Sequence, residues 1–319
     1  MKTPYKVILR SQKKKNYLIT IAIGKKFLDE WNKYAKPLWL KYCKKNNLGL
    51  IVVTDNLIDP TNPFWKKATW QKMLLGSFFK NTSIKINNIC YLDTDILINP
   101  NAPNIFNFHD ENKISLISQV SNLPYDLNLI RRRISFNRRN YYSKKYKLDS
   151  SLFMSVDQIY KWHNLKPQKD FACAGVIVFN VKFFSGVMYK WFFKYTKKLK
   201  TLSGGGDEPI FNYELFNTKK IKLLDYKFQA LWIYEMAFKY PYLYEYKSKK
   251  NKTIKNCIES SLENNYFLHF AGSWYEGQMW KIKNIFNNKK KLDLNSRFVK
   301  YLLKPVFGIP SGRVLPNGK

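Results

Sequence analysis

Two aspartates interrupt an otherwise apolar segment of this chain. Asn88–Ile98 reads NICYLDTDILI, and Asp93 and Asp95 are its only charged residues. In a strand, the alternation of side chains would put both carboxylates on one face. Burying two anions together is costly unless a cation lies between them, and Mg²⁺ or Mn²⁺ is the cation that prefers oxygen ligands. The alternative is a solvated turn that carries two aspartates.

Two further segments carry residues that could do chemistry. Asp207-Glu208 follow the triple glycine Gly204–Gly206 and precede a helix predicted over Ile210–Phe216. The two carboxylates could cap this helix or form a catalytic loop. His269 is one of three histidines and lies in the apolar run Tyr266–Trp274. It is either a buried structural histidine or a third metal ligand.

A strand–helix–strand pattern positions these residues. Asn16–Gly24 reads as a buried strand, apolar residues then recur at helical spacing from Phe27 to Lys45, and Leu48–Asp55 reads as a second strand. This order predicts a parallel βαβ unit and a doubly wound α/β sheet. No G-x-G-x-x-G follows the first strand, which excludes a classical dinucleotide site. Asp93 falls at the carboxyl end of a later strand, where open sheets bind their ligands.

The other expected elements surround this unit. Ala68–Phe79 has the spacing of an amphipathic helix, with Lys72 off its apolar face, either solvated or reaching a phosphate. Gly175 leaves room for a ligand to approach the backbone of a later strand closely. Further strands are predicted at Ile114–Gln119 and Phe171–Asn180, and a further helix at Phe183–Lys200.

The chain is strongly basic, with a formal net charge of +34, and only eight of its 56 basic residues are arginine. The charge indicates an anionic partner or, equally well, the lysine-rich composition of an AT-rich genome. Residues 121–169 show no clear period and hold a basic cluster, Arg131–Lys147, that reads as a surface excursion or an anion-binding lid. A basic nucleic-acid-binding protein or metal-dependent nuclease is therefore the alternative function. Against it, the basic residues are scattered and form no recognisable binding motif.

Cysteine usage and hydropathy indicate the compartment. The four cysteines form no C-x-x-C pair, and three of them sit in apolar contexts and read as small core residues of a protein in a reducing environment. No signal-peptide apolar core is visible, and Phe171–Phe193 is interrupted by Asn180 and Lys182, which argues against a membrane span. We therefore expect a cytoplasmic protein. Lysines in Lys247–Lys255 and Lys281–Lys291 could hold it peripherally against anionic membranes.

Four segments, in this order, resemble GT-A fold glycosyltransferases, most closely the family-eight type that includes glycogenins and bacterial galactosyl- and glucosyltransferases. They are WQKMLL, YLDTDILI, AGVIVFN and LHFAGSW, at positions 70–75, 91–98, 174–180 and 268–274. The resemblance implies a single GT-A type, Rossmann-like α/β domain over residues 1–280, with a mixed, mostly parallel central sheet flanked by helices. Residues 121–169 would then be a basic insertion and candidate acceptor lid, and 281–319 a basic C-terminal extension.

The resemblance also implies a function. A hexose would pass from a nucleotide sugar, UDP-glucose or UDP-galactose, to a glycan, protein or lipid acceptor, with retention of configuration and with Mn²⁺ or Mg²⁺ bound. No specific nucleic acid partner is implied. The residues at the positions of the family's functional groups are the metal ligands Asp93, Asp95 and His269, the catalytic pair Asp207 and Glu208, and the donor-binding residues Thr20, Ala22, Lys72, Asp93, Cys173, Gly175, Gly272 and Trp274.

The sequence departs from the family pattern in two places. Cys173 stands where the family usually has asparagine, and the usual Lys-Pro-Trp after the histidine–glycine turn is reduced to Ser273-Trp274. Both changes affect the donor side of the site more than the metal side. The residues alone also leave the role of Asp207 and Glu208 open between stabilising an oxocarbenium-like transition state and acting as a general base.

Overall fold

The structure is a computed structural model. It describes residues 3–12, 14–141, 154–196, 206–244, 251–272 and 276–286. Met1–Ile282 form one compact unit. Lys283–Lys319 form a second unit, of which only residues 283–286 are described.

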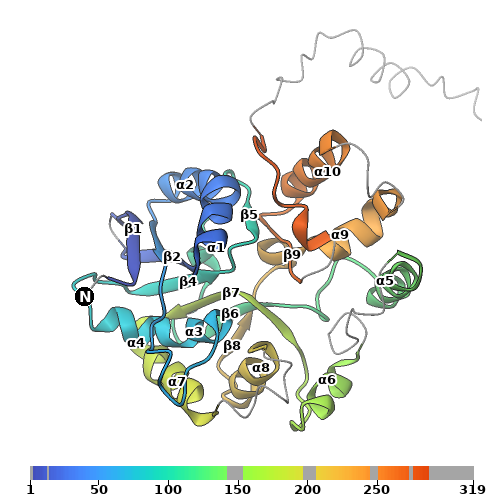
Figure 1. Ribbon diagram of the computed structural model, residues 1–319. Coiled ribbons are helices and arrows are strands. Elements are labelled where there is room, and N and C mark those ends of the chain that lie inside the picture. The colour runs from blue at the N-terminus through green and yellow to red at the C-terminus, as the bar shows by residue number, and fades with distance from the viewer. Residues whose placement is uncertain are drawn as a thin grey trace, which may run out of the picture. The chain divides into compact units, whose positions relative to one another are not determined.

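Seven strands form the central sheet, in the order β1-β3-β2-β4-β7-β6-β8 (Figure 1). Strands β3, β2, β4, β6 and β8 share one direction, whereas β1 and β7 run antiparallel to their neighbours. The predicted α/β fold with a mixed, mostly parallel sheet is therefore confirmed. The strands are β1 Tyr5–Leu9, β2 Asn16–Ile21, β3 Gly49–Val53, β4 Asn88–Leu92, β6 Ile114–Ser118, β7 Ala172–Asn180 and β8 Ile221–Leu223.

The predicted βαβ unit is present at the start of the sheet. β2 and β3 pair in parallel, with Tyr17 opposite Gly49 and Ile21 opposite Val53. The chain between them is helical from Lys25 to Lys45 and lies on one side of the sheet (Figure 1). Its three parts are α1 Lys25–Glu30, a π-helical turn Trp31–Ala35 and α2 Lys36–Lys45.

Helices on the other side of the sheet bury its second face. Tyr17, Ile19 and Ile21 alternate along β2 and pack in one apolar cluster with residues of α3, α4, α7 and α8. This alternation follows from strand geometry, because every second side chain points to the same face. The predicted helix at Ala68–Phe79 is observed as α3 Ala68–Gln71, a 3₁₀ turn Lys72–Leu74 and α4 Leu75–Lys80. The remaining helices of this layer are α7 Val181–Lys194 and α8 Glu208–Asn217.

A second, three-stranded sheet, β5-β10-β9, lies beside the first. β10 pairs antiparallel with β5 and parallel with β9. The strands are β5 Ile96–Ile98, β9 Ala230–Leu231 and β10 Phe267–His269, and the nearby helices are α9 Trp232–Lys239 and α10 Asn251–Asn264.

The segment 121–169 contains more regular structure than expected. Its described part forms α5, Leu127–Tyr141, and α6, Val156–Trp162. Ile130 and Ile134, four residues apart, are fully buried and give α5 its apolar side. That spacing is hidden in the sequence by the arginines between them. α6 begins with a capping box in which Ser155 and Gln158 bond each other's backbone N–H groups.

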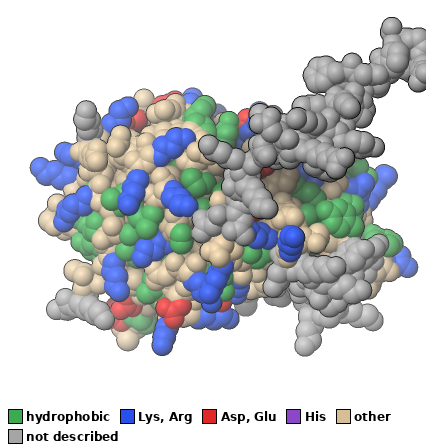
Figure 2. All heavy atoms as spheres, turned by 90° about the horizontal axis from the view of Figure 1, so that it is seen from above, with side chains coloured by type: hydrophobic (Ala, Val, Ile, Leu, Met, Phe, Trp, Pro, Cys, Tyr) green, Lys and Arg blue, Asp and Glu red, His purple; other side chains and the backbone are tan. Residues whose placement is uncertain are grey.

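The burial of the cysteines and the distribution of the basic side chains can be compared with what the sequence predicted. All four cysteines are free and buried, one more than the three for which a core position was predicted. Lysines and arginines are scattered among apolar and neutral groups over the face that Figure 2 shows. Within the described ranges, no helix combines the length and the apolar character that crossing a membrane requires.

Candidate metal and donor-binding site

Asp93-Thr94-Asp95 is a turn, which corrects the prediction of a strand running through both aspartates. β4 ends at Leu92 and belongs to the large sheet, whereas β5 begins at Ile96 and belongs to the small one. The two carboxylates therefore converge because the chain turns between two sheets, and not because of strand alternation. Their side chains are 30% and 26% exposed, so the turn is only partly solvated.

Backbone hydrogen bonds hold this turn from two directions. The N–H of Asp93 donates to the carbonyl of Gly175 on β7, at 2.9 Å. The N–H of Phe270, next to β10, donates to the carbonyl of Asp95, at 3.1 Å. Just beyond the turn, the indole N–H of Trp39 donates to the carbonyl of Ile96, at 2.8 Å. Strands from both sheets and helix α2 thus fix the position of the turn.

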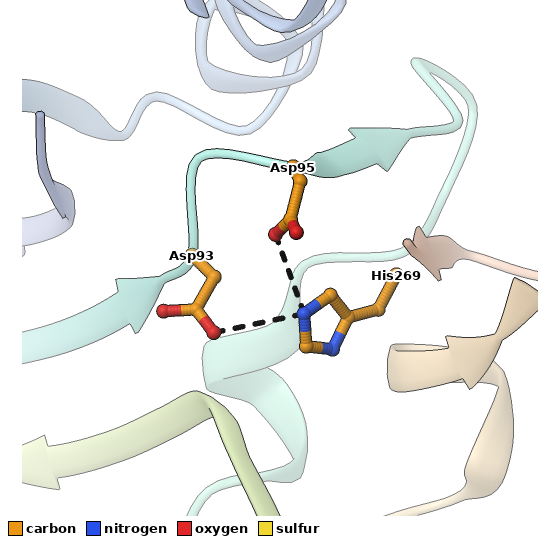
Figure 3. A group of neighbouring side chains, drawn as sticks. All are labelled: Asp93, Asp95 and His269. Atoms are coloured by element: carbon orange, nitrogen blue, oxygen red, sulfur yellow. Dashed lines mark ion pairs between the residues drawn. The ribbon is translucent and has the colours of Figure 1, made fainter. Parts of the chain in front are cut away.

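The imidazole of His269 lies between the two carboxylates (Figure 3). Its Nε2 is 3.3 Å from Oδ1 of Asp95 and 3.6 Å from Oδ2 of Asp93. His269 is the last residue of β10, and its pairing with Ile96 of β5 brings it beside the turn. Among the described residues, these three side chains form a group with metal-ligand spacing, their ligand atoms all within 4.8 Å of one another.

The donor set suits a divalent metal. The ligands of an octahedral Mg²⁺, at about 2.1 Å from the ion, stand about 3 Å apart, which is close to the separations found here. Two carboxylate oxygens and one imidazole nitrogen suit Mn²⁺ or Mg²⁺. Burial lowers the pKa of His269, but Cys173 and Asp95 outweigh it and raise that pKa well above its usual range. The site therefore favours a positive charge between its carboxylates.

Two neighbours of His269 shape the space around its ring. Gly175 has no side chain at a point where a Cβ atom would lie 2.3 Å from Cε1 of His269. The close approach that we predicted for Gly175 is therefore made by the His269 ring. Gln229 places its side-chain amide 3.0 Å from Nδ1 of His269. The sequence did not point to Gln229, which has no motif around it.

Tyr91 fixes one oxygen of Asp93. Its hydroxyl donates to Oδ1 at 2.5 Å, and this leaves Oδ2 facing His269. Burial, together with the charge of Asp93, raises the pKa of Tyr91 well above its usual value. The hydroxyl therefore stays protonated and remains a donor. Tyr91 belongs to the YLDTDILI segment, but the sequence did not indicate that its hydroxyl bonds Asp93.

Lys72 forms a buried ion pair with Asp207. Nζ is 3.0 Å from Oδ2 of Asp207 and donates to the carbonyl of Ala174 at 2.7 Å. The side chains are 3% and 7% exposed, so the solvated alternative for Lys72 is wrong. Burial lowers the pKa of Lys72, but Asp207 and then Asp93 more than compensate and raise it. Asp207 is also the N-cap of α8 but makes no side-chain capping bond, so simple capping is excluded.

Glu208 is hydrogen-bonded within the protein. Its Oε1 accepts from the N–H of Ala174 and from Nε2 of Gln119, both at 2.9 Å. Burial is the main cause that raises the pKa of Glu208, and the charge of Asp207 adds to it. The β7 residue Ala174 therefore contacts both Lys72 and Glu208, and it places the ion pair and the second carboxylate side by side.

The remaining predicted donor-binding residues have different positions. Thr20 lies in β2 and Ala22 directly after it, and both are buried. Cys173 lies in β7 with its Sγ 3.5 Å from Nδ1 of His269. Gly272 has a φ of +94°, which favours glycine. Trp274 is outside the described residues, and the donor contacts of all five stay predictions.

Part of the basic cluster in 121–169 makes internal contacts. Arg131 donates to the carbonyl of Met154 at 2.8 Å, and Arg133 donates to the carbonyls of Ala237 and Phe238 at 3.0 and 3.1 Å. The second half of the cluster falls in residues 142–153, outside the described ranges. Arg131 and Arg133 thus join α5 to neighbouring segments, and these internal contacts do not favour the nucleic-acid alternative.

Comparisons with known proteins give structural matches alone. No protein-family model and no curated protein matches the chain. A glycosyltransferase involved in the glycosylation of the major capsid of PBCV-1 matches 83% of this chain and 100% of its own, at 9% identity and a TM-score of 0.47. The galactosyltransferase LgtC, solved with donor and acceptor sugar analogues, matches 81% and 87%, at 10% identity and a TM-score of 0.44. The bifunctional glycosyltransferase WbbM matches 82% and 46%, at 11% identity and a TM-score of 0.38. All three of these solved structures are of glycosyltransferases.

Proposed function

We propose that this chain is a metal-dependent glycosyltransferase that moves a hexose from a nucleotide sugar, UDP-glucose or UDP-galactose, to an acceptor hydroxyl. One observation carries the proposal. Asp93, Asp95 and His269 form a three-residue cluster just beyond the carboxyl end of β4, and the charge of Asp93 also acts on Lys72 of the Lys72–Asp207 ion pair. This is the edge of an open α/β sheet at which ligands bind.

A metal bound by these ligands would act as a Lewis acid toward the donor diphosphate. The chain's own residues supply the rest of the setting. Tyr91 holds Asp93 so that one carboxylate oxygen faces the site. Lys72 balances the charge of Asp207, so the region behind the turn carries less negative charge toward an incoming diphosphate. These groups are already in position before the donor binds. Preorganised groups stabilise developing charge efficiently because they need not reorganise during the reaction.

The same geometry supports transfer with retention. An inverting enzyme needs a general base that is free to take the acceptor proton. Asp207 is neutralised by Lys72, and one oxygen of Glu208 already accepts two hydrogen bonds. Asp207 is therefore not a free base, and one oxygen of Glu208 is already committed to the protein. We therefore assign them to orienting the donor sugar and to stabilising the positive charge that develops on it.

The acceptor is a glycan, protein or lipid, and the lysine-rich segments could bring a membrane-proximal acceptor close. Residues 247–250 and 287–291 of those segments fall outside the described ranges, so peripheral membrane contact stays a prediction. Binding to liposomes of acidic and of neutral lipid would test it. Equal binding to both would count against an electrostatic attachment.

The function itself is tested by UDP-hexose hydrolysis without acceptor. We expect Mn²⁺ to stimulate release of UDP from UDP-glucose or UDP-galactose. Asp95→Asn should reduce this stimulation by more than the roughly 10–100-fold that changes outside the ligand shell cause. Asp157→Asn is the matched control, because Asp157 is an exposed aspartate in α6. ¹H NMR of the first hexose released should show the α-anomer if configuration is retained.

A binding measurement gives an independent outcome. UDP with Mn²⁺ should raise the melting temperature of the unaltered protein, because a ligand that binds only the folded state stabilises it. If saturating UDP and Mn²⁺ leave the melting temperature unchanged, and no UDP-sugar is hydrolysed, the proposal is wrong.

A further inference from the structure

Gln229 lies behind the proposed metal ligand His269, on the side away from the aspartates. It is the last residue of the 3₁₀ helix Tyr226–Gln229, its exposure is 1%, and its amide is 3.0 Å from Nδ1 of His269. The opposite ring nitrogen, Nε2, faces Asp93 and Asp95. Gln229 thus contacts the one ring nitrogen of His269 that does not face the carboxylates.

The surroundings of the Gln229 amide assign its orientation. With its oxygen toward the imidazole, it accepts from Nδ1 of His269 at 3.0 Å and from the N–H of Val176 at 3.2 Å. Its NH₂ group then donates to the carbonyl of Cys173, also at 3.2 Å. The reverse orientation would put the NH₂ group against a backbone N–H and the oxygen against a carbonyl. Since an amide oxygen only accepts and its nitrogen only donates, the first orientation is the one that satisfies every group.

This orientation decides which nitrogen of His269 carries the proton. An amide oxygen at Nδ1 requires a proton there, so the neutral imidazole presents an unprotonated Nε2 to the two carboxylates. A metal ligand needs that free lone pair, and the hydrogen bond on the other nitrogen commonly fixes it. Cys173 Sγ also lies near Nδ1, at 3.5 Å, but sulfur is a weaker acceptor than an amide oxygen.

The backbone holds Gln229 in register with His269. The next residue, Ala230, begins β9 and pairs with Leu268 of β10, so Gln229 directly precedes the strand that pairs with the one carrying His269. Gly175 completes the enclosure, because a Cβ there would lie 2.7 Å from the side-chain amide of Gln229. The amide therefore has little room to turn away from the ring.

We propose that Gln229 is a positioning residue that holds His269 in the Nδ1-protonated tautomer and so directs Nε2 at the metal. This inference rests on the metal site of the proposed function. It extends that site by a residue that touches neither the metal nor the substrate, and it makes binding of the metal itself depend on a buried amide.

Two substitutions separate hydrogen bonding from packing. Gln229→Met keeps the volume but removes the acceptor, and we expect Mn²⁺ binding, measured by titration calorimetry, to weaken about 10–100-fold. Gln229→Glu restores an acceptor oxygen at Nδ1, and we expect its affinity to return to the order of magnitude of the unaltered protein. Asn88→Leu is the control, because Asn88 is a buried amide bonded to Asn16 and Asn180 at the start of the strand that ends before Asp93. It should leave Mn²⁺ affinity unchanged.

Imidazole NMR reads the tautomer directly. The protein has three histidines, so ¹⁵N-histidine labelling with bound Mg²⁺ gives few signals, and His269→Gln assigns one of them. We expect protonated Nδ1 and unprotonated Nε2 at His269, and loss of that pattern in Gln229→Met.

The outcomes distinguish this inference from the proposed function. If the unaltered protein binds no Mn²⁺, the metal site and the inference fail together. If it binds Mn²⁺ and Gln229→Met binds equally well, the inference alone is overturned. If Gln229→Glu binds as weakly as Gln229→Met, packing and not the acceptor is what matters, and the inference is also overturned.

Discussion

Replacing Lys72 by methionine tests the charge balance behind the metal ligands. The substitution keeps most of the volume and removes the ammonium that lies 3.0 Å from Oδ2 of Asp207 and 2.7 Å from the carbonyl of Ala174. Asp207 would then be a buried carboxylate without its cation. We expect Lys72→Met to lower the free energy of unfolding by about 3–5 kcal/mol, the usual cost of breaking a buried pair from one side.

The size of this effect follows from burial. The two side chains are 3% and 7% exposed, so solvent cannot replace the lost partner. An exposed pair would cost only about 0–1 kcal/mol. Removing both charges in Lys72→Met/Asp207→Asn leaves a neutral amide where the carboxylate was. The double variant should therefore be more stable than the sum of the two single changes predicts, by about 1–3 kcal/mol.

Urea denaturation of the metal-free protein, followed by tryptophan fluorescence, measures all four corners of this cycle. Because metal is absent, a change in ligand binding cannot imitate a change in stability. Additivity within about 0.5 kcal/mol would refute the reasoning, since independent sites behave in that way. A cost below about 1 kcal/mol for Lys72→Met would show that the pair is screened by water despite its burial.

Gly175→Ala and Glu208→Gln should change stability in opposite directions. Gly175→Ala should abolish Mn²⁺ binding and destabilise the fold, because its Cβ would meet the ring of His269 at 2.3 Å. The matched control Gly186→Ala, with open space in helix α7, should instead stabilise by up to about 1 kcal/mol, and thermal unfolding with and without Mn²⁺ compares them. Glu208→Gln keeps an acceptor for Ala174 and removes a buried charge. Burial raises the pKa of Glu208, so the folded protein holds this proton more tightly than the unfolded chain does. The unaltered protein should therefore lose stability relative to Glu208→Gln as pH rises from about 4.5 through the raised pKa. The loss should be up to about 1.4 kcal/mol per pH unit. A difference that is constant with pH in urea titrations would contradict this.

The grouping of Asp93, Asp95 and His269 could be predicted because the chemistry of these residues is visible in the chain. Two carboxylates in an apolar run need a cation, and His269 is one of few histidines and follows its own apolar run. The strands and helices of the βαβ unit could be predicted for a similar reason, since long apolar segments carry clear periods. Both predictions use local composition, which a sequence displays directly.

The features that the sequence hid depend on contacts between distant segments. The residues around Asp93 do not indicate that the apolar residues Ile96–Ile98 belong to a second sheet. The contact that Gln229 makes is with His269, which lies 40 residues further along the chain. The predicted strand ends earlier than expected, at Leu92, because the pairing partners of a strand limit its length. Those partners lie elsewhere in the chain.

The turn between the two sheets explains how the three candidate ligands, two of them close in the sequence and one far from both, can be held at a fixed spacing. Asp93 is tied to the large sheet through Gly175, whereas Asp95 is tied to the small sheet through Phe270. His269 belongs to the small sheet and is set by its pairing with Ile96. A shift of β10 by one residue would turn the imidazole to the opposite face, because side chains alternate along a strand. The register of a three-residue strand therefore determines whether the site has two ligands or three.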